Sequence, residues 1–237
     1  MNLVPIIQFQ NDPIITIDSL TGNLKIKHQE HMNGGGTIFR IPLLHCIKKY
    51  GKSSYNRGLE WCSGPGFLGY ELLDANIANH MSFYDYYEKS IDFCKETAII
   101  NFIEEKVSTF VSSTIGGLPN SDKWDLVIGN PPHSWNLEEG RTSLQNAENR
   151  QDDVTIENML RILVDDNMET HKEFFSNIRP RLTSDADLFI IEHDHSKKEI
   201  YKNMAEEGGL CLINVYPFES ENYETFEHKI YHFKVNS

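Results

Sequence analysis

The chain has 237 residues, of which 39% are hydrophobic and 24% charged, a composition typical of a folded globular protein with one large domain. No run of about 18 apolar residues occurs, and the first residues lack the features of a secretory signal, so we expect no membrane span and a cytoplasmic location. The formal net charge of -13 makes a nucleic-acid partner less expected, because nucleic-acid binding depends on positive charge. The four cysteines have no zinc-binding spacing, so no metal site is predicted.

Residues 1–57 are predicted to form an N-terminal extension or cap. Ile14–Asp18 and residues 24–28 have the residue types of strands, with a turn between them. Apolar residues at helical spacing predict a helix over residues 38–50, which ends before Gly51.

From residue 58 to 237, strands and helices alternate, and this part is predicted to be one domain. The predicted strands cover residues 58–62, 82–84, 106–111, 124–129, 188–191, 211–216 and 229–235, and the predicted helices cover residues 67–79, 86–100, 154–163, 170–179 and 197–206. This alternation predicts a doubly wound α/β fold, a mostly parallel sheet with helices on both faces. The last two strands have no helix between them, so they predict an antiparallel C-terminal hairpin.

The most informative segment is residues 59–69, Leu-Glu-Trp-Cys-Ser-Gly-Pro-Gly-Phe-Leu-Gly. A strand with an acidic residue is followed by a glycine-rich turn and then by a helix. Glycine lets the backbone turn sharply and approach a ligand, and the helix N-terminus beyond the turn offers free N–H groups. The pattern predicts a cofactor-binding loop that includes Cys62, Ser63, Gly64 and Gly66.

Two acidic residues flank this loop. Glu60, near the end of the strand, suits a cation such as the ammonium group of a methionine better than it suits a phosphate. Asp85 follows the next strand, where a carboxylate can accept hydrogen bonds from both ribose hydroxyls of an adenosine. The two acids therefore favour a cofactor that carries both a cation and an adenosine.

A second strong element is the run Asn130-Pro131-Pro132-His133, directly after an apolar strand. Prolines fix φ and favour an extended chain, so the strand end is stiff and can point a carbonyl group into a pocket. The Asn130 amide oxygen and the Pro131 carbonyl oxygen could hold the two hydrogens of an –NH2 group. The nitrogen lone pair would then point at an electrophilic methyl group. His133 could pack on a flat substrate.

Together these two segments resemble class I S-adenosylmethionine-dependent methyltransferases. More narrowly, they resemble the N-methyltransferases with an Asn-Pro-Pro-aromatic motif, which act on exocyclic amines or amides. The resemblance covers residues 58 to about 235 and implies a Rossmann-like sheet of seven strands with S-adenosyl-L-methionine as the cofactor. It also implies that Glu60, Gly64 and Gly66 lie at the cofactor, Asp85 at its ribose, and Asn130 with Pro131 at the amine.

The chain departs from this family in three places. Cys62 stands where the first glycine of the loop often lies. In residues 111–114, Val-Ser-Ser-Thr replaces a region where the family often has an acid near the adenine, and Ser113 is the expected substitute. His133 replaces the commoner tyrosine or phenylalanine, and a histidine can both stack and take a proton.

Two further segments invite a functional interpretation. His193 and His195 follow the predicted fifth strand, at the edge where such sheets bind ligands. They could contact the substrate, accept a proton or bind a metal, although a polar loop is the simpler interpretation. Residues 133–153 are long and polar, as substrate lids often are.

The leading hypothesis is an N-methyltransferase that acts on an amine or amide nitrogen of a protein side chain or a small metabolite. Asn130, Pro131 and His133 are its expected catalytic residues, and no metal is needed. An enzyme of the same fold could instead cyclise or cleave S-adenosylmethionine and release methylthioadenosine. The third alternative is a non-catalytic protein that binds S-adenosylmethionine. The sequence predicts neither the acceptor nor the oligomeric state.

Overall fold

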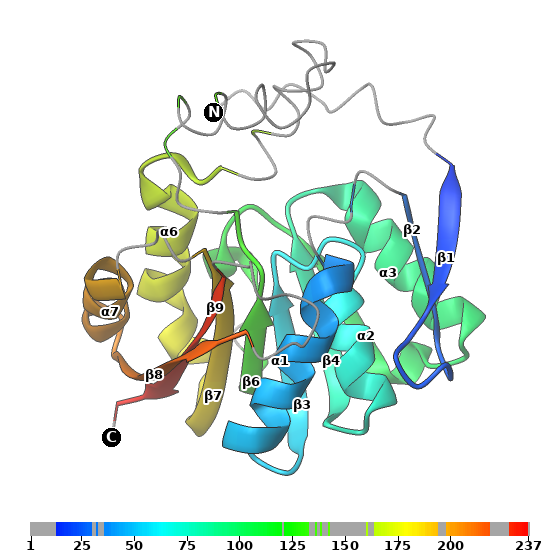
Figure 1. Cartoon of the computed structure of the whole chain (residues 1–237), viewed down its shortest axis with the longest axis horizontal. Helices are drawn as coiled ribbons and strands as arrows, with labels where there is room; N and C mark the ends of the chain where they lie inside the picture. Colours follow the sequence, from blue (N-terminus) through cyan, green and yellow to red (C-terminus); the bar gives the residue numbers. More distant parts are fainter. Residues whose placement is uncertain are drawn as a thin grey trace.

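The computed structural model describes residues 13–29, 32, 36–119, 121–132, 136, 138, 142, 160, 164–193, 198–218 and 228–236. These residues contain two sheets. The smaller sheet is an antiparallel hairpin of β1 (Ile14–Asp18) and β2 (Lys25–Gln29). The larger sheet has seven strands in the order β5-β4-β3-β6-β7-β9-β8 (Figure 1).

The large sheet is mostly parallel. Its strands are, in chain order, β3 (Tyr55–Trp61), β4 (Ala78–Asp85), β5 (Val107–Val111), β6 (Trp124–Gly129), β7 (Leu182–Glu192), β8 (Leu210–Pro217) and β9 (Lys229–Val235). Strands β3 to β7 are parallel to their neighbours among these five, and β9 is antiparallel to both β7 and β8. The predicted doubly wound, mostly parallel fold with an antiparallel C-terminal hairpin is confirmed.

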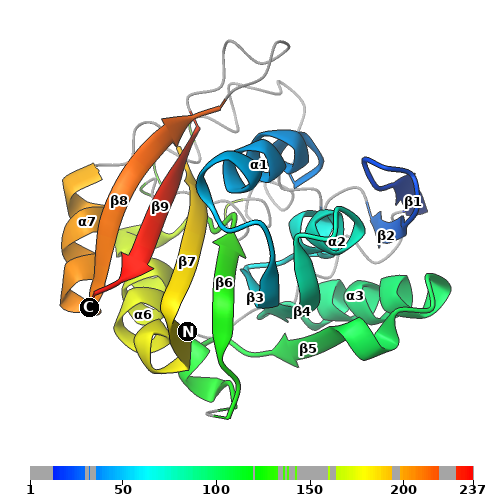
Figure 2. The ribbon, with the colours of Figure 1, turned by 90° about the horizontal axis from the view of Figure 1, so that it is seen from below.

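Helices cover both faces of this sheet. On one face lie α1 (Gly36–Tyr50), α2 (Phe67–Asp74) and α3 (Glu88–Ile100), and on the other lie α6 (Glu169–Ile178) and α7 (Lys198–Glu207) (Figures 1 and 2). Short 3-10 helices occur at Glu104–Lys106, Ile115–Gly117, Asp166–Met168 and Arg179–Arg181.

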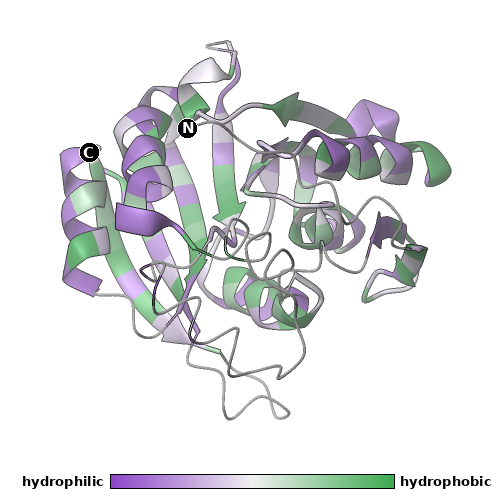
Figure 3. Ribbon diagram, turned by 90° about the horizontal axis from the view of Figure 1, so that it is seen from above, coloured by the Kyte–Doolittle hydropathy of each residue, from purple (hydrophilic) through white to green (hydrophobic). Residues whose placement is uncertain are grey.

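Each face of the sheet has its own hydrophobic core. Ile128 and Ile191 pack with α1 and α2, whereas Val127 and Ile190 pack with α6 and α7. Successive side chains of a strand point to opposite faces, so strands covered on both sides are apolar throughout. Figure 3 shows this as hydrophobic colour along the central strands, next to helices in which both colours alternate.

The described part of the N-terminal region packs on the same domain. Residues Phe39, Leu43 and Ile47 of α1 belong to the core shared with α2. A Cβ atom added at Gly36 would lie 2.5 Å from the Phe67 ring, so the start of α1 lies directly against the start of α2. The β1–β2 hairpin is held to α3, where the Lys27 N–H donates to the Thr97 hydroxyl at 3.0 Å. A domain boundary at residue 58 stays a prediction.

Three predicted elements have wrong boundaries. The helix predicted over residues 67–79 ends at Asp74, because Asn76 adopts a left-handed φ of 55° that no helix interior accommodates. The chain then enters β4 at Ala78, earlier than the predicted start at residue 82. Strand β7 is also longer than residues 188–191, because its polar first half does not look like a buried strand. The predicted helix over residues 154–163 lies outside the described residues except for Leu160.

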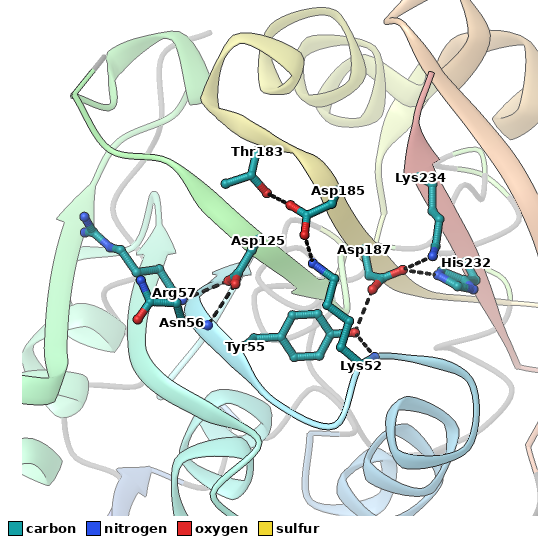
Figure 4. Close-up of polar contacts among 10 residues, drawn as sticks. All are labelled: Lys52, Tyr55, Asn56, Arg57, Asp125, Thr183, Asp185, Asp187, His232 and Lys234. Carbon is teal, nitrogen blue, oxygen red and sulfur yellow. Dashed lines mark hydrogen bonds and ion pairs between the residues drawn. The ribbon is translucent and has the colours of Figure 1, made fainter. Parts of the chain in front are cut away.

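A buried polar network lies toward the amino ends of the parallel strands (Figure 4). The Asp187 carboxylate is 0% exposed and accepts hydrogen bonds from the Tyr55 hydroxyl and the His232 ring, both at 2.8 Å. The Lys234 ammonium nitrogen lies 3.3 Å from Asp187 Oδ1. Burial alone would raise the pKa of Asp187, but the bonds from His232 and Tyr55 outweigh it and hold the pKa below its usual value. This network ties β3, β7 and β9 together.

Candidate active site

The predicted site residues meet at the carboxyl edge of the parallel strands. Trp61, the last residue of β3, is in register with Tyr84 of β4 and with Gly129 of β6. The next residues along these strands, Cys62, Asp85 and Asn130, therefore lie at the same edge of the sheet. Ligands of open α/β sheets bind outside this edge, so the fold brings the predicted loop and the Asn-Pro-Pro run to the expected place.

Residues 62–66 form the turn from β3 into α2. Gly64 and Gly66 have φ values of 51° and 84°, in the left-handed region that favours glycine. A Cβ atom at Gly66 would lie 2.7 Å from the Phe83 ring, so packing of the loop on β4 also requires glycine there. Among the described residues, a Cβ atom at Gly64 would meet only the Met32 carbonyl oxygen, at 3.6 Å. The backbone at Gly64 is thus open to close approach.

Cys62 is the first residue of this turn and also has a left-handed φ, of 52°. The resemblance places a glycine at this position, and the backbone explains why. Burial raises the pKa of the Cys62 thiol, and the carboxylates of Asp85, Asp165 and Glu192 raise it further. The thiol is therefore protonated at neutral pH and lies in a negative electrostatic environment.

Cys62→Gly should be tolerated much better than Cys62→Val. Glycine adopts the observed φ freely, whereas a β-branched side chain is strained there, so we expect the valine variant to be less stable than the glycine variant by about 2 kcal/mol. Urea unfolding of both variants measures this difference. Equal stabilities of the two would show that the left-handed backbone at Cys62 imposes no constraint.

Glu60 points its carboxylate at the start of α2. Its Oε2 atom accepts a hydrogen bond from the Gly69 N–H at 2.7 Å, and the side chain is buried. Burial raises the pKa of Glu60 to about 8, although the bonds from the Gly69 and Leu68 backbone oppose this. Glu60 thus has a structural task at the N-terminus of α2, and its role toward a cofactor stays a prediction.

Asp85 clamps the glycine loop from the end of β4. One carboxylate oxygen accepts the Gly64 N–H and the other accepts the Tyr87 N–H, each at 2.8 Å. The side chain is buried, which raises its pKa, while these backbone bonds lower it. The loop is further fixed by the Ser63 N–H, which donates to the Tyr84 carbonyl at 3.0 Å. Asp85 therefore supports the loop conformation whether or not it also binds a ribose.

The remaining predicted residues lie at the same edge or outside the described chain. Asn130 is half-buried and Pro131 is buried at the end of β6. Ser113 is exposed, two residues beyond the end of β5, where Val111 is in register with Asp85. His133 and most of residues 133–153 lie outside the described residues, and so does His195.

His193 follows β7 directly and contacts another histidine. Its ring centroid lies 4.9 Å from that of His228, in an edge-on arrangement. Burial and the nearby His193 lower the pKa of His228 to about 4. No group of three or more histidine, cysteine or acidic side chains in the described part of the chain is arranged to hold a metal ion.

The sequence analysis missed a buried triad of Asp165, His171 and Glu192. The His171 ring, 0% exposed, has Nδ1 2.6 Å from Asp165 Oδ2 and Nε2 2.8 Å from Glu192 Oε1. Burial would lower the pKa of His171, but Glu192 and Asp165 outweigh it and raise the pKa to about 9. The ring is therefore an imidazolium at neutral pH, and both of its N–H groups donate.

This triad lies beside the glycine loop of residues 62–66. The His171 ring packs edge-on against Trp61, with ring centroids 5.3 Å apart. Glu192 is the last residue of β7, directly after four apolar residues. An acidic residue at the end of an apolar strand is a signal that could have predicted a role for Glu192. The functional interpretation was instead given to His193 and His195, which follow it.

Comparisons with known proteins agree with this geometry. Residues 42–150, a little under half of the chain, match the family model of the methyltransferase small domain. This span includes both the glycine loop and the Asn-Pro-Pro run. No curated protein sequence matches significantly.

Solved structures that align with this fold include methyltransferases of several kinds. The ribosomal protein L11 methylase from Lactobacillus delbrueckii subsp. bulgaricus aligns with a TM-score of 0.56 at 10% identity, over 83% of this chain and 78% of that one. The mitomycin 7-O-methyltransferase MmcR aligns at 0.57 and 11% identity, over 85% of this chain but only 55% of that chain. The tRNA m1G37 methyltransferase from M. jannaschii aligns with a TM-score of 0.56 at 13% identity, over 96% of this chain and 58% of that one.

At these identities the likeness shows the fold alone, and the neighbours' acceptors differ from one another. No helix in the described part of the chain is long and apolar enough to cross a membrane. The family match over residues 42–150 and the shared fold support an S-adenosylmethionine-dependent methyltransferase.

Proposed function

We propose that the protein is an N-methyltransferase that acts on an amine or amide nitrogen of a protein side chain or a small metabolite. The observation that carries this proposal is the position of Asn130. It follows Gly129, which is in register with Trp61, so Asn130 lies next to Cys62, the first residue of the glycine loop. An acceptor nitrogen held there would be close to a methyl group held by the loop.

The residues of the loop suit a cationic cofactor. S-adenosylmethionine supplies a methyl group made electrophilic by the positive sulfur to which it is bonded. The carboxylates that raise the pKa of Cys62 give the loop a negative potential, which stabilises such a cation. The open space at Gly64 allows close approach, and Glu60 and Asp85 would bind near the ammonium group and the ribose. The donor set therefore fits the cofactor.

Asn130 and Pro131 would orient the acceptor. The Asn130 amide oxygen and the Pro131 carbonyl oxygen accept two N–H bonds from the nitrogen, and the adjacent prolines keep both acceptors in place. His133 would stack on the acceptor or take its proton. The net charge of -13 favours a protein or small-molecule acceptor over nucleic acid.

The decisive experiment separates methyl transfer from consumption of the cofactor. Purified protein is incubated with S-adenosylmethionine alone and then with added cell extract, and the nucleoside products are identified by mass spectrometry. We expect a stable cofactor in the first reaction and S-adenosylhomocysteine in the second, with the methyl-labelled extract component naming the acceptor.

Two results would contradict this expectation. Rapid formation of methylthioadenosine without extract would identify an enzyme that cyclises or cleaves the cofactor. Tight cofactor binding with no product under either condition would indicate a non-catalytic binding protein.

A further inference from the structure

Glu192 has one carboxylate oxygen that nothing in the described part of the chain uses. Its Oε1 atom is held by His171 at 2.8 Å. Its Oε2 atom is buried and has no hydrogen-bond partner among the described residues, although the whole side chain is only 1% exposed. A buried acceptor without a partner is unfavourable, so such an atom calls for a donor that a ligand can bring.

The charge of the triad makes this oxygen a strong acceptor. The His171 imidazolium is shared between two carboxylates, which leaves one net negative charge on the three side chains. Both carboxylate oxygens of Asp165 already have partners. Its Oδ1 atom accepts the Thr170 N–H at 2.9 Å, and its Oδ2 atom bonds His171. The unused acceptor capacity therefore lies at Glu192.

Glu192 also lies at the edge where the acceptor is expected. Gly129 of β6 is in register with Ile190 of β7, so Pro131 lies opposite Glu192, one strand spacing or about 5 Å away. The carboxylate contributes to the negative environment of Cys62, which places it near the cofactor loop as well. The strand end thus puts a carboxylate beside both elements of the proposed site.

We propose that Oε2 of Glu192 binds an N–H of the methyl acceptor, so that the acceptor is an aliphatic amine rather than an amide. This inference rests on the proposed N-methyltransferase function and narrows its substrate class. An amide nitrogen is uncharged at neutral pH, whereas an aliphatic amine arrives as an ammonium ion, which a buried carboxylate oxygen with a net negative charge favours.

The proton and electron balance is complete without any further reagent. The ammonium ion loses one proton to water and becomes a neutral amine, which stays bound through an N–H to Glu192 Oε2. The nitrogen lone pair then forms the N–C bond to the methyl group while the C–S bond breaks and its electron pair returns to sulfur. The methylated amine leaves as a cation.

Methylammonium ion is a suitable probe, because it is the smallest aliphatic amine. Its binding to the protein saturated with S-adenosylhomocysteine is followed by NMR titration, so that no turnover interferes. We expect saturable binding to the wild type that is at least about 10-fold tighter than binding of tetramethylammonium, which has the same charge and no N–H. Glu192→Gln should weaken methylammonium binding about 10- to 100-fold and leave the affinity for S-adenosylhomocysteine unchanged.

Asp185→Asn is the matched control, since it makes the same charge change on the same strand at an exposed site. It should bind methylammonium as the wild type does. Equal binding of methylammonium and tetramethylammonium to the wild type overturns the proposal, even if the Glu192 variant fails to fold. Equal methylammonium binding by the wild type and a folded Glu192→Gln variant overturns it too.

These outcomes are distinct from failure of the proposed function. If extract-dependent S-adenosylhomocysteine forms but methylammonium does not bind through Glu192, only this inference fails. If methylammonium binding requires Glu192 but no transfer occurs, the amine site stands and the N-methyltransferase proposal fails.

Discussion

Replacing Asn130 by alanine is expected to slow methyl transfer about 100- to 1,000-fold and to change the affinity for S-adenosylmethionine by less than about threefold. The amide is proposed to orient the acceptor nitrogen and lies one residue beyond the strand position in register with Trp61. Its loss removes alignment, whereas the cofactor loop at residues 62–66 keeps its own glycines and its clamp by Asp85. The effect should therefore appear in the rate of the chemical step.

The measurement needs two assays on the same protein. S-adenosylhomocysteine formation with labelled extract gives the rate, and calorimetry gives the affinity for S-adenosylmethionine. Asn56→Ala is the control, because Asn56 is exposed at the opposite end of β3 (Figure 4). A variant at Asn130 that transfers methyl groups as fast as the control would remove the amide from the mechanism.

Replacing Asp187 by alanine is expected to destabilise the fold by about 3–5 kcal/mol. The carboxylate is fully buried and receives bonds from Tyr55 and His232, so its removal leaves two buried donors without an acceptor. Asp185→Ala, two residues away on the same strand, should change the free energy of unfolding by no more than about 1 kcal/mol. Its side chain is 70% exposed and pairs with Lys52 at the surface.

The wild type and Asp187→Ala should also differ in how their stability depends on pH in the acid range. The pKa of Asp187 is held below its usual value in the folded state, so its contribution to stability is present above about pH 3.9, the unfolded value, and is lost as the pH falls below it. Urea unfolding between neutral pH and about pH 3 measures this. Wild-type protein should lose more stability over that window than Asp187→Ala, and parallel pH curves would contradict the assigned role.

The fold and the conformation of the glycine loop could be predicted because their signals are local. The glycine turn after an apolar strand and the Asn-Pro-Pro run each occupy a few consecutive residues, and the parallel sheet brings both to one edge. The prediction for β9 succeeded for the same reason, since residues 229–235 form one uninterrupted strand.

The polar networks could not be predicted, because their members are far apart in the chain. Tyr55 and Asp187 are separated by 132 residues, and the sequence around neither residue indicates that the two are in contact. His171 and Glu192 are closer, but His171 occurs in an amphipathic helix, where a histidine is ordinarily exposed. Its burial depends on how α6 packs against Trp61 of a distant strand. Such pairings follow from the tertiary fold and not from local patterns.

The position of β9 has a consequence for how the protein is made. This strand lies between β7 and β8, so in the described sheet β8 pairs only with β9, and β9 also covers the edge of β7 that faces away from β6. During synthesis, both strands leave the ribosome before β9 does, and each carries an unpaired edge until then. The seven-stranded sheet can be completed only after the chain has been synthesised as far as Val235. A nascent chain stalled before that point would expose two apolar strand edges and would be a natural client of chaperones.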